Sequence, residues 1–351
     1  MPLITSDQLL SFAQQAFAKV GLDGSLREVM ARSLVEADLL GHYTHGTNLL
    51  VPYCTELAEG KMSKSGMPVV LKESAVTALW DGQRLPGPYL TELAITAASK
   101  MARQHGTGTV VMRRSHHIAC LAAFLEAPAR SGLVTQIQCS DPLVASVAPF
   151  GGCVPMITPN PLAASYPTSA DPIIIDVSMS VTAMGQVQLK RSLGEPIPEG
   201  WLMDSAGNGT TDPNVLWQEP KGSILPLGGF LAGHKGFALG LMVEAMTGGL
   251  SGLGRADDRE AHGGWGANVC VQVIDPDFFG NLTEFKRQMD VLVNKTHASQ
   301  TDTTKPKARV PGEGGLARKL QQLARGIALP ESIYVALSDY AEYNSLNNCF
   351  K

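Results

Sequence analysis

Two histidines lie three residues apart in GHYTHGTNLL, residues 41–50, with a threonine directly before the second histidine and a glycine directly after it. Histidine titrates close to neutral pH, so it can give or take a proton in an enzymatic reaction. The stretch lies between two helical periods, because Gly41 is placed to end one helix and a new period includes Leu49. Histidines in such junctions are more often surface or capping residues than catalytic ones, so the cluster alone does not establish a reaction.

Three other junctions between a loop and an expected helix contain groups that attract anions. His116 and His117 follow a strand-like run and precede a stretch of small residues. Lys235 lies in GHKGFALG at an expected helix start, and Arg318 follows the Pro-Gly turn of VPGEGGLARK. Backbone N–H groups at a helix start favour an anion. With Asp176 at the end of PIIID, these junctions would suit a dinucleotide, although the histidine pair could equally cap a well-packed helix.

The sequence lacks the motifs of other common enzyme classes. There is no H-E-x-x-H and no C-x-x-C, so no metal site is predicted. There is also no G-x-S-x-G elbow of a serine hydrolase, and no strand is followed by G-x-G-x-x-G and a helix. The histidines that a metal ion would need are scattered along the chain, at His42, His45, His116, His117, His234 and His262.

Helical periods dominate both ends of the chain. Ser6 can cap a first helix, and Asp23 or Ser25 can cap a second one. Near the C-terminus, LARKLQQLARGI and PESIYVALSDYAEY have helical spacing. Helices at both ends of one chain are typical of a discontinuous outer domain, which we place at residues 1–70 with 305–351.

Strand-like runs dominate the middle of the chain, over residues 71–304. The runs AVTALWDG, GTVVMRR, LVTQIQCS, PIIIDVS and ANVCVQVID are short, apolar and bounded by Gly, Pro or Asp, which is typical of a sheet. Helical spacing occurs between them, in YLTELAITAASKMARQHG, ACLAAFLEAPARSG, HKGFALGLMVEAMTGGLSG and EFKRQMDVLVNK. The pattern predicts a second domain of the α/β class.

Charge and cysteine content exclude several classes of partner. The 351 residues have a formal net charge of -4 and a pI near 6.1, which leaves no basic face for nucleic acid or acidic lipid. No apolar run reaches membrane-spanning length, and the N-terminal residues lack the features of a signal peptide. The cysteines are widely scattered, which is typical of reduced thiols. We expect a cytoplasmic protein whose partner is a small molecule.

The order of these stretches along nearly the whole chain resembles the malate/L-lactate dehydrogenase family, which lacks the Rossmann fold. The resemblance rests on GHYTHG, RRSHHIA, VAPFGG, PNPLAASYPT, IIIDVSMS, GHKGFALGLMVEAMTGGLSG and VPGEGGLARK. The family includes sulfolactate and ureidoglycolate dehydrogenases and piperideine-2-carboxylate reductases, and the sequence looks most similar to its hydroxycarboxylate dehydrogenase branch. The resemblance implies NAD(P)-dependent reduction of a 2-oxo acid or a cyclic 2-imino acid, and oxidation of a 2-hydroxy acid.

The resemblance also implies the architecture. It predicts an α/β fold whose non-Rossmann NAD(P)-binding domain has a mixed, largely antiparallel sheet, beside a helical outer domain built from both chain ends. It further implies a homodimer whose active site lies between the domains. The cofactor is expected to be NAD or NADP, with NADPH slightly favoured, and no metal is expected.

Site residues follow from the resemblance by motif position. Thr44 and His45 match the family's Ser-His pair, in which the histidine gives or takes the proton and the hydroxyl orients its ring. Substrate contacts are implied for Leu49, His117, Pro159, Gly185 and Gln186. Cofactor contacts are implied for His117, Ile118, Ala119, Cys120, Leu121, Asp176, Ser178, His234, Lys235, Gly312, Glu313 and Arg318.

Three positions depart from the family pattern on the substrate side. Leu49 replaces an arginine that binds the substrate carboxylate, Pro159 replaces a threonine, and Gln186 lies where a relay acid is expected. Leucine cannot replace a bidentate guanidinium. Either another cation, such as Arg113 or Arg114, therefore binds the carboxylate, or the substrate has a larger apolar side chain. The open alternatives are a 2-oxo-acid reductase, a cyclic imino-acid reductase, and a cofactor-binding protein without turnover.

Overall fold

The computed structural model describes residues 3–256, 265–299, 306–347 and 349–350. His262, one of the scattered histidines, lies outside the described residues. Within them, no helix is long and apolar enough to cross a membrane.

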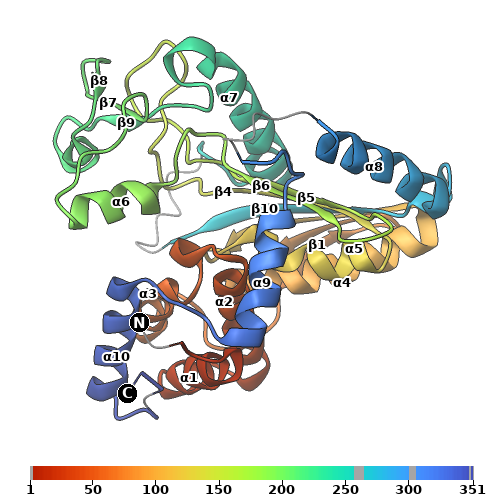
Figure 1. The fold of residues 1–351 in the computed structure, drawn as a ribbon, viewed down its shortest axis with the longest axis horizontal. Coiled ribbons are helices and arrows are strands. Elements are labelled where there is room, and N and C mark those ends of the chain that lie inside the picture. Colours follow the sequence, from red (N-terminus) through yellow and green to blue (C-terminus); the bar gives the residue numbers. More distant parts are fainter. Residues whose placement is uncertain (1–2, 257–264, 300–305, 348, 351) are drawn as a thin grey trace.

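A seven-stranded sheet forms the centre of the molecule (Figure 1). In spatial order its strands are β1 (Val69–Glu73), β2 (Thr77–Asp81), β3 (Thr107–Ser115), β10 (Ala267–Ile274), β4 (Val134–Ser140), β5 (Leu162–Tyr166) and β6 (Ile173–Val177). Only β2 and β3 pair in parallel, and the other neighbours are antiparallel. The expected strand runs are therefore confirmed, in a mixed and mostly antiparallel sheet.

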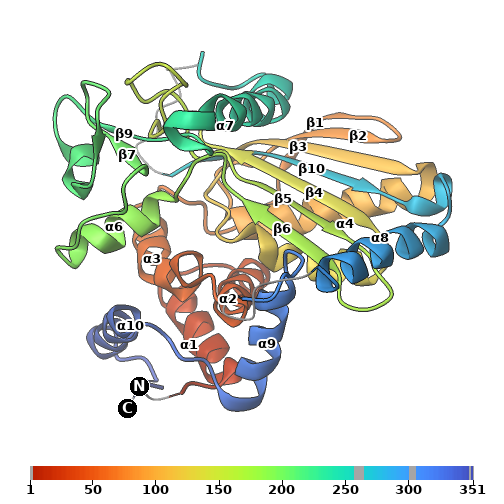
Figure 2. The ribbon, with the colours of Figure 1, turned by 45° about the horizontal axis from the view of Figure 1, so that its top comes forward.

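Helices cover both faces of this sheet. Helix α4 (Gly87–His105) packs closely on one face, because a Cβ on Gly108 would lie 2.2 Å from the carbonyl oxygen of Ala98. The other face contacts a short π-helical turn, Ala245–Gly249, through a 2.7 Å hydrogen bond between Ser140 and Thr247. Figure 2 shows α7 (Gly229–Glu244), which leads into that turn, on the side away from α4.

Helices from both ends of the chain pack against one another. They are α1 (Ser6–Lys19), α2 (Gly24–Leu40), α3 (Leu50–Ala58), α9 (Glu313–Arg325) and α10 (Glu331–Tyr343). A backbone bridge between Ile4 and Ile327 joins the two chain ends, and Figures 1 and 2 place both termini in this helical group. The N-cap of α1 is Thr5, one residue before the expected Ser6, because Thr5 and Gln8 form a capping box.

A third group of elements lies beside the sheet. It includes α6 (Met184–Ser192), α7 and a small sheet ordered β8 (Gly209–Thr210), β7 (Leu202–Met203) and β9 (Ser223–Ile224). A separate apolar cluster around Val147, Ile157, Val187 and Leu202 stabilises it. The helix α8 (Leu282–His297) lies near the opposite end of the main sheet (Figure 1).

Two expectations about helix starts were wrong. The stretch ACLAAFLEAPARSG forms a 3₁₀ turn, Leu121–Phe124, and the five-residue helix α5, Glu126–Arg130, instead of one long helix. Pro128 has no N–H to donate, which disfavours a continuous helix there. Lys235 is also not at a helix start, because α7 begins earlier, after the left-handed Gly228.

Candidate active site

The histidine cluster lies in two short 3₁₀ turns, Tyr43–His45 and Thr47–Leu49, between α2 and α3. Gly41 ends α2 in the left-handed conformation with φ 88°, as its position in the sequence predicts. A Cβ on Gly41 would also lie 2.0 Å from Nη1 of Arg318. The left-handed backbone therefore requires glycine at this position, and the side chain of Arg318 from α9 lies close against it.

Thr44 and His45 interact directly. The Thr44 hydroxyl lies 2.9 Å from Nδ1 of His45, within hydrogen-bond distance. This bond occupies Nδ1 and leaves Nε2 as the nitrogen that can exchange a proton with another molecule. A Cβ on Gly185, near the start of α6, would lie 3.5 Å from Cβ of Thr44. The start of α6 is therefore in contact range of the Thr44–His45 pair.

His117 lies beside His45. Their rings are stacked at an interplanar angle of 25°, with centroids 6.1 Å apart. Nδ1 of His117 is 2.7 Å from the hydroxyl of Tyr53 and 3.4 Å from the backbone nitrogen of Ala119. Because the amide can only donate, Nδ1 is an acceptor and Nε2 carries the proton. The ring of Trp265 lies 5.4 Å from His117 and encloses it from another side.

Burial keeps both histidines neutral. It lowers the pKa of His117 to about 3, with smaller contributions from neighbouring His45 and His116. Burial also lowers the pKa of His45, and the nearby carboxylate of Asp176 opposes that shift. His45 is thus close enough to Asp176 to be influenced by its charge.

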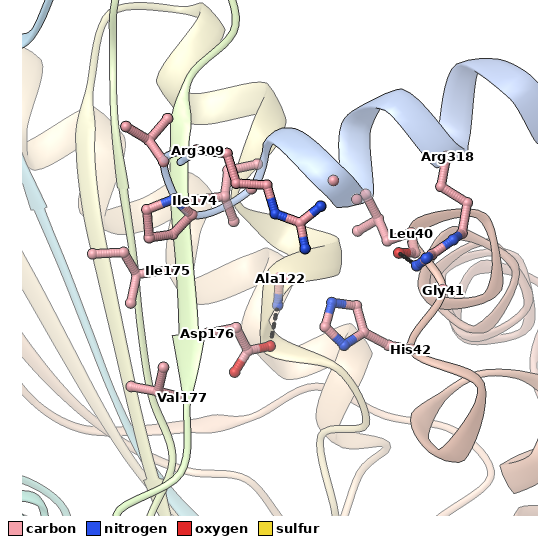
Figure 3. Close-up of a pocket in the computed structure, with 15 residues that line it drawn as sticks. Leu40, Gly41, His42, Ala122, Ile174, Ile175, Asp176, Val177, Arg309 and Arg318 are labelled. Atoms are coloured by element: carbon pink, nitrogen blue, oxygen red, sulfur yellow. Dashed lines mark hydrogen bonds between the residues drawn. The ribbon is translucent and has the colours of Figure 1, made fainter. Parts of the chain in front are cut away.

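Asp176 belongs to a pocket of about 410 Å³ between β6, α2 and the start of α9 (Figure 3). Its polar lining is formed by His42, Asp176, Arg309 and Arg318. Figure 3 shows the guanidinium of Arg309 extending toward His42 and Asp176. Oδ2 of Asp176 accepts a 2.9 Å hydrogen bond from the backbone nitrogen of Ala122. One carboxylate, two guanidinium groups and an imidazole thus surround the same space.

Gly312 shapes this pocket from the loop before α9. Its φ is 96°, and a Cβ there would lie 2.8 Å from the backbone nitrogen of Ile174 in β6. Only glycine fits such a position without strain. Gly314 and Gly315 also line the pocket, so its wall consists largely of backbone that a ligand could approach closely.

The predicted site residues fall into four groups. Thr44, His45, His117 and Gly185 surround one point, and Asp176, Gly312 and Arg318 line the adjacent pocket. Ile118, Ala119, Cys120 and Leu121 are buried between the two, and Cys120 Sγ lies 3.8 Å from Oδ2 of Asp176. The pocket lining does not include Leu49, Pro159, Ser178, Gln186, His234, Lys235 or Glu313.

Several residues of the last group have other contacts. Leu49 is 8% exposed and packs in the main hydrophobic core. The carbonyl of Pro159 accepts from the nitrogen of Met179 at 2.7 Å. Glu313 pairs with His297, and the exposed His234 lies against the ring of Phe150.

The two arginines considered as substitutes for the missing carboxylate ligand are already paired. Arg113 and Arg114 both donate to the carboxylate of Asp81, which is 1% exposed. These bonds lower the pKa of Asp81 against the opposing effect of its burial. Nothing in the spacing of the residues indicates this pairing, because Asp81 ends a strand 32 residues before Arg113.

Three residues near the site were not singled out from the sequence. Tyr53 has helical spacing and resembled a core residue, while Arg309 and Trp265 lie in loops without a motif. In the described residues, no group of three His, Cys, Asp or Glu could hold a metal ion.

The comparisons with known proteins cover nearly the whole chain. The profile of the malate/L-lactate dehydrogenase family matches residues 4–338. A malate dehydrogenase of Pyrococcus horikoshii is 31% identical over 345 residues, covering 97% of this chain and 94% of the relative. A Delta(1)-pyrroline-2-carboxylate reductase of Ancylobacter novellus is 30% identical and covers 90% and 91%. The crystal structure of malate dehydrogenase from Entamoeba histolytica has the same fold, with a TM-score of 0.93, 23% identity and 99% coverage of both chains.

Proposed function

Because the chain belongs to the malate/L-lactate dehydrogenase family, we propose that it transfers a hydride between NAD(P) and a 2-oxo or 2-hydroxy carboxylate. The observation that supports this proposal is the arrangement of Thr44, His45 and His117 next to the pocket of Asp176. A reduced nicotinamide supplies the hydride when it is bound. The residues of this chain then bind the two reactants and move the proton.

His45 provides the proton in the direction of reduction. A carbonyl carbon that receives a hydride leaves an alkoxide, which needs a proton near neutral pH. Nε2 of His45 is the available nitrogen, because Nδ1 is engaged by Thr44. His117 presents an N–H at Nε2, because its Nδ1 accepts from Tyr53 and Ala119. That N–H can hydrogen-bond to the carbonyl oxygen and hold it near His45.

The pocket beside Asp176 fits a dinucleotide. Its cations can bind phosphate oxygens, and its glycine-rich wall allows close approach of the backbone. We assign Asp176, Gly312, Arg309 and Arg318 to the cofactor. The contacts of Ile118 to Leu121, Ser178, His234, Lys235 and Glu313 remain predictions.

NADPH is the better candidate of the two nicotinamides. The 2′-phosphate that distinguishes it needs a cation, and the guanidinium of Arg309 extends into the pocket. Arg318 lines the same space and adds a second positive charge. The carboxylate of Asp176 opposes the binding of a phosphate, so the guanidinium groups of Arg309 and Arg318 must outweigh it.

Leu49, Pro159, Gly185 and Gln186 stay predicted substrate contacts, with Gly185 the one that lies against Thr44. Since Asp81 binds Arg113 and Arg114, we favour a substrate with an apolar side chain and one carboxylate. Reduction of a cyclic 2-imino acid is the second candidate, because a relative at 30% identity has that activity in its name.

We also propose that two copies associate through α7. Its buried residues are Gly233, Gly236, Gly240 and Val243, so three of the four lack a side chain, whereas Leu231 is 94% exposed. Phe230, Leu239, Leu241 and Met242 are exposed as well. A helix of a monomer normally buries its large apolar residues, so this reversed arrangement fits a homodimer interface. Analytical ultracentrifugation should give a dimer that Leu231→Glu converts to a monomer.

The division of the chain into two domains is part of the same proposal. Residues 71–304 would bind NAD(P) through a sheet that replaces the Rossmann fold, and residues 1–70 with 305–351 would form the outer domain. We assign the protein to the cytoplasm, since its six cysteines are free thiols, as expected in a reducing compartment.

The decisive assay follows the absorbance of reduced nicotinamide, with NADPH and NADH in parallel. The panel contains 2-oxo acids from pyruvate to phenylpyruvate, together with piperideine-2-carboxylate and pyrroline-2-carboxylate. Oxidation with a 2-oxo acid supports the main proposal, whereas activity with the cyclic imines alone favours the second candidate. Tight cofactor binding by fluorescence without any oxidation would instead identify a cofactor-binding protein without turnover.

A further inference from the structure

Asp38, near the end of α2, is a fully buried carboxyl group. Its Oδ2 accepts two hydrogen bonds from Thr47, one from the backbone nitrogen at 3.0 Å and one from the hydroxyl at 2.6 Å. Its Oδ1 has no hydrogen-bond partner in the described part of the chain. Such a carboxyl is expensive to bury, and burial raises the pKa of Asp38 to about 7. An apolar side chain would fill the same space at a lower free-energy cost. The presence of a carboxyl group here therefore indicates that its two hydrogen bonds to Thr47 have a function.

The bonds from Thr47 attach the His45 loop to α2. Within the loop, the nitrogen of His45 donates to the carbonyl of His42 at 2.8 Å, and Leu49 donates to Gly46 at 2.9 Å. These bonds define the local shape of the two 3₁₀ turns. The bonds between Asp38 and Thr47 span nine residues, and they fix where the loop lies relative to the helix.

Packing on both sides of Asp38 leaves little freedom. A Cβ on Gly46, the residue after His45, would lie 2.0 Å from Oδ1 of Asp38. On the other side, Nε2 of Gln322 in α9 donates to the carbonyl oxygens of Asp38 and Leu39, each at 2.9 Å. Asp38 is thus held by α9 through its backbone, and it holds the loop through its side chain.

We propose that Asp38 is a positioning residue that keeps His45 beside His117 and the Asp176 pocket by binding both polar groups of Thr47. The inference rests on the proposed function of His45 as the proton donor. Asp38 itself contacts neither reactant. A displacement of a reacting group by about 1 Å can lower turnover by roughly 10²-fold, so the loss of this attachment should appear in kcat.

The experiment compares Asp38→Ala, Asp38→Asn and Thr47→Val in the full-length protein. Asn keeps an oxygen that can accept both bonds from Thr47, whereas Ala removes it. We expect kcat to fall by about tenfold or more in Asp38→Ala, with the Kd of NADPH within about twofold of the unchanged protein. Asp38→Asn should restore most of kcat, and Thr47→Val, which loses the hydroxyl alone, should lie between them. Leu9→Ala, a buried residue of α1, serves as a control for lost stability without a lost attachment.

A second readout does not depend on turnover. The imidazole signals of His45 are followed by NMR against pH, with His45→Gln for assignment. In Asp38→Ala the released ring gains solvent, so its pKa should rise toward the ordinary value of about 6.5. This readout still tests the positioning role if no substrate is oxidised or reduced.

Either of two results would overturn the proposal. One is that Asp38→Ala, folded, retains both the kcat and the His45 titration of the unchanged protein. The other is that Asp38→Asn is as impaired as Asp38→Ala at equal thermal stability, because hydrogen bonding to Thr47 would then not be what matters. If Asp38→Ala does not fold, Asp38→Asn is compared with Thr47→Val. The proposal is then wrong if Thr47→Val retains as much kcat as Asp38→Asn and the His45 titration of the unchanged protein.

Discussion

The two loops beside the Asp176 pocket are stabilised in different ways. In the loop around His45, polar side chains bind one another, as Thr44 binds His45 and Thr47 binds Asp38. In the loop before α9, Arg309 extends into the pocket (Figure 3). The backbone of Gly312 forms part of the pocket wall. Proton transfer needs a group in a fixed position, whereas a charged ligand needs groups that remain accessible until it binds. Mutations in the first loop should therefore change turnover, and mutations in the second should change affinity.

The largest effect is expected for His45→Ala. Loss of a general acid typically lowers turnover by about 10²-fold or more. Cofactor affinity should stay within about twofold, because His45 is not part of the pocket lining. Initial rates and fluorescence titration with NADPH measure the two quantities, and the exposed His105→Ala is the control. A fully active His45→Ala protein would remove the proton-donor role from this loop.

The dependence of the rate on pH should have opposite sign in the two directions of the reaction. Burial keeps the pKa of His45 below 6.5, so the neutral ring predominates at pH 7. Reduction needs the imidazolium, and its rate should fall by about tenfold per pH unit above that pKa. Oxidation needs the neutral ring, and its rate should fall as the pH drops below the same pKa. A reduction rate that rises with pH between 6 and 8 would show that His45 is not the donor.

The arrangement of secondary structure could be predicted from the sequence much better than the contacts between elements. Asp23 caps α2 and Gly41 ends it, as their local chemistry predicts. Five expected strand runs are present because β-branched and apolar residues alternate with clear breaks. The long helix expected after His117 is absent. The helical spacing of the apolar residues does not take into account that Pro128 lacks an N–H or that Ala119 has a backbone φ of 58°.

The site was predicted only where a motif marked it. Thr44, His45 and Asp176 were predicted from their motifs, and the structure brings them near one another. Arg309 and Tyr53 have no local signal, because their importance comes from contacts with residues far away in the sequence. Arg113 is the opposite example. The sequence indicated it as a substrate ligand, but in the structure its guanidinium is paired with Asp81. Such pairings depend on tertiary packing, which spacing in one chain does not reveal.

A smaller effect is expected for Arg309→Ala. An accessible ion pair contributes up to about 1 kcal/mol, so the Kd of NADPH should rise by about fivefold. The Kd of NADH and the kcat at saturating cofactor should change by less than about twofold, because NADH lacks the 2′-phosphate. Arg287→Ala, which removes an exposed arginine of α8 paired with Glu284, is the matched control. Equal weakening of both cofactors would place Arg309 at the shared phosphates and leave the NADPH preference without support.

The smallest effect is expected for Gly185→Ala, and the same substitution at Gly46 is its counterpart. A Cβ on Gly185 would lie 3.5 Å from Cβ of Thr44, an ordinary contact, so kcat should change by less than about twofold and the KM of the substrate should rise only slightly. A Cβ on Gly46 would lie 2.0 Å from Oδ1 of Asp38, so Gly46→Ala must displace the loop or the carboxyl group and should lower kcat more strongly. Both glycines lie next to the Thr44–His45 pair, but only Gly46 contacts the side chain that attaches the loop to α2. Similar kcat values for the two variants would mean that the loop tolerates displacement, and the contrast between a fixed loop for proton transfer and an accessible loop for binding would then be wrong.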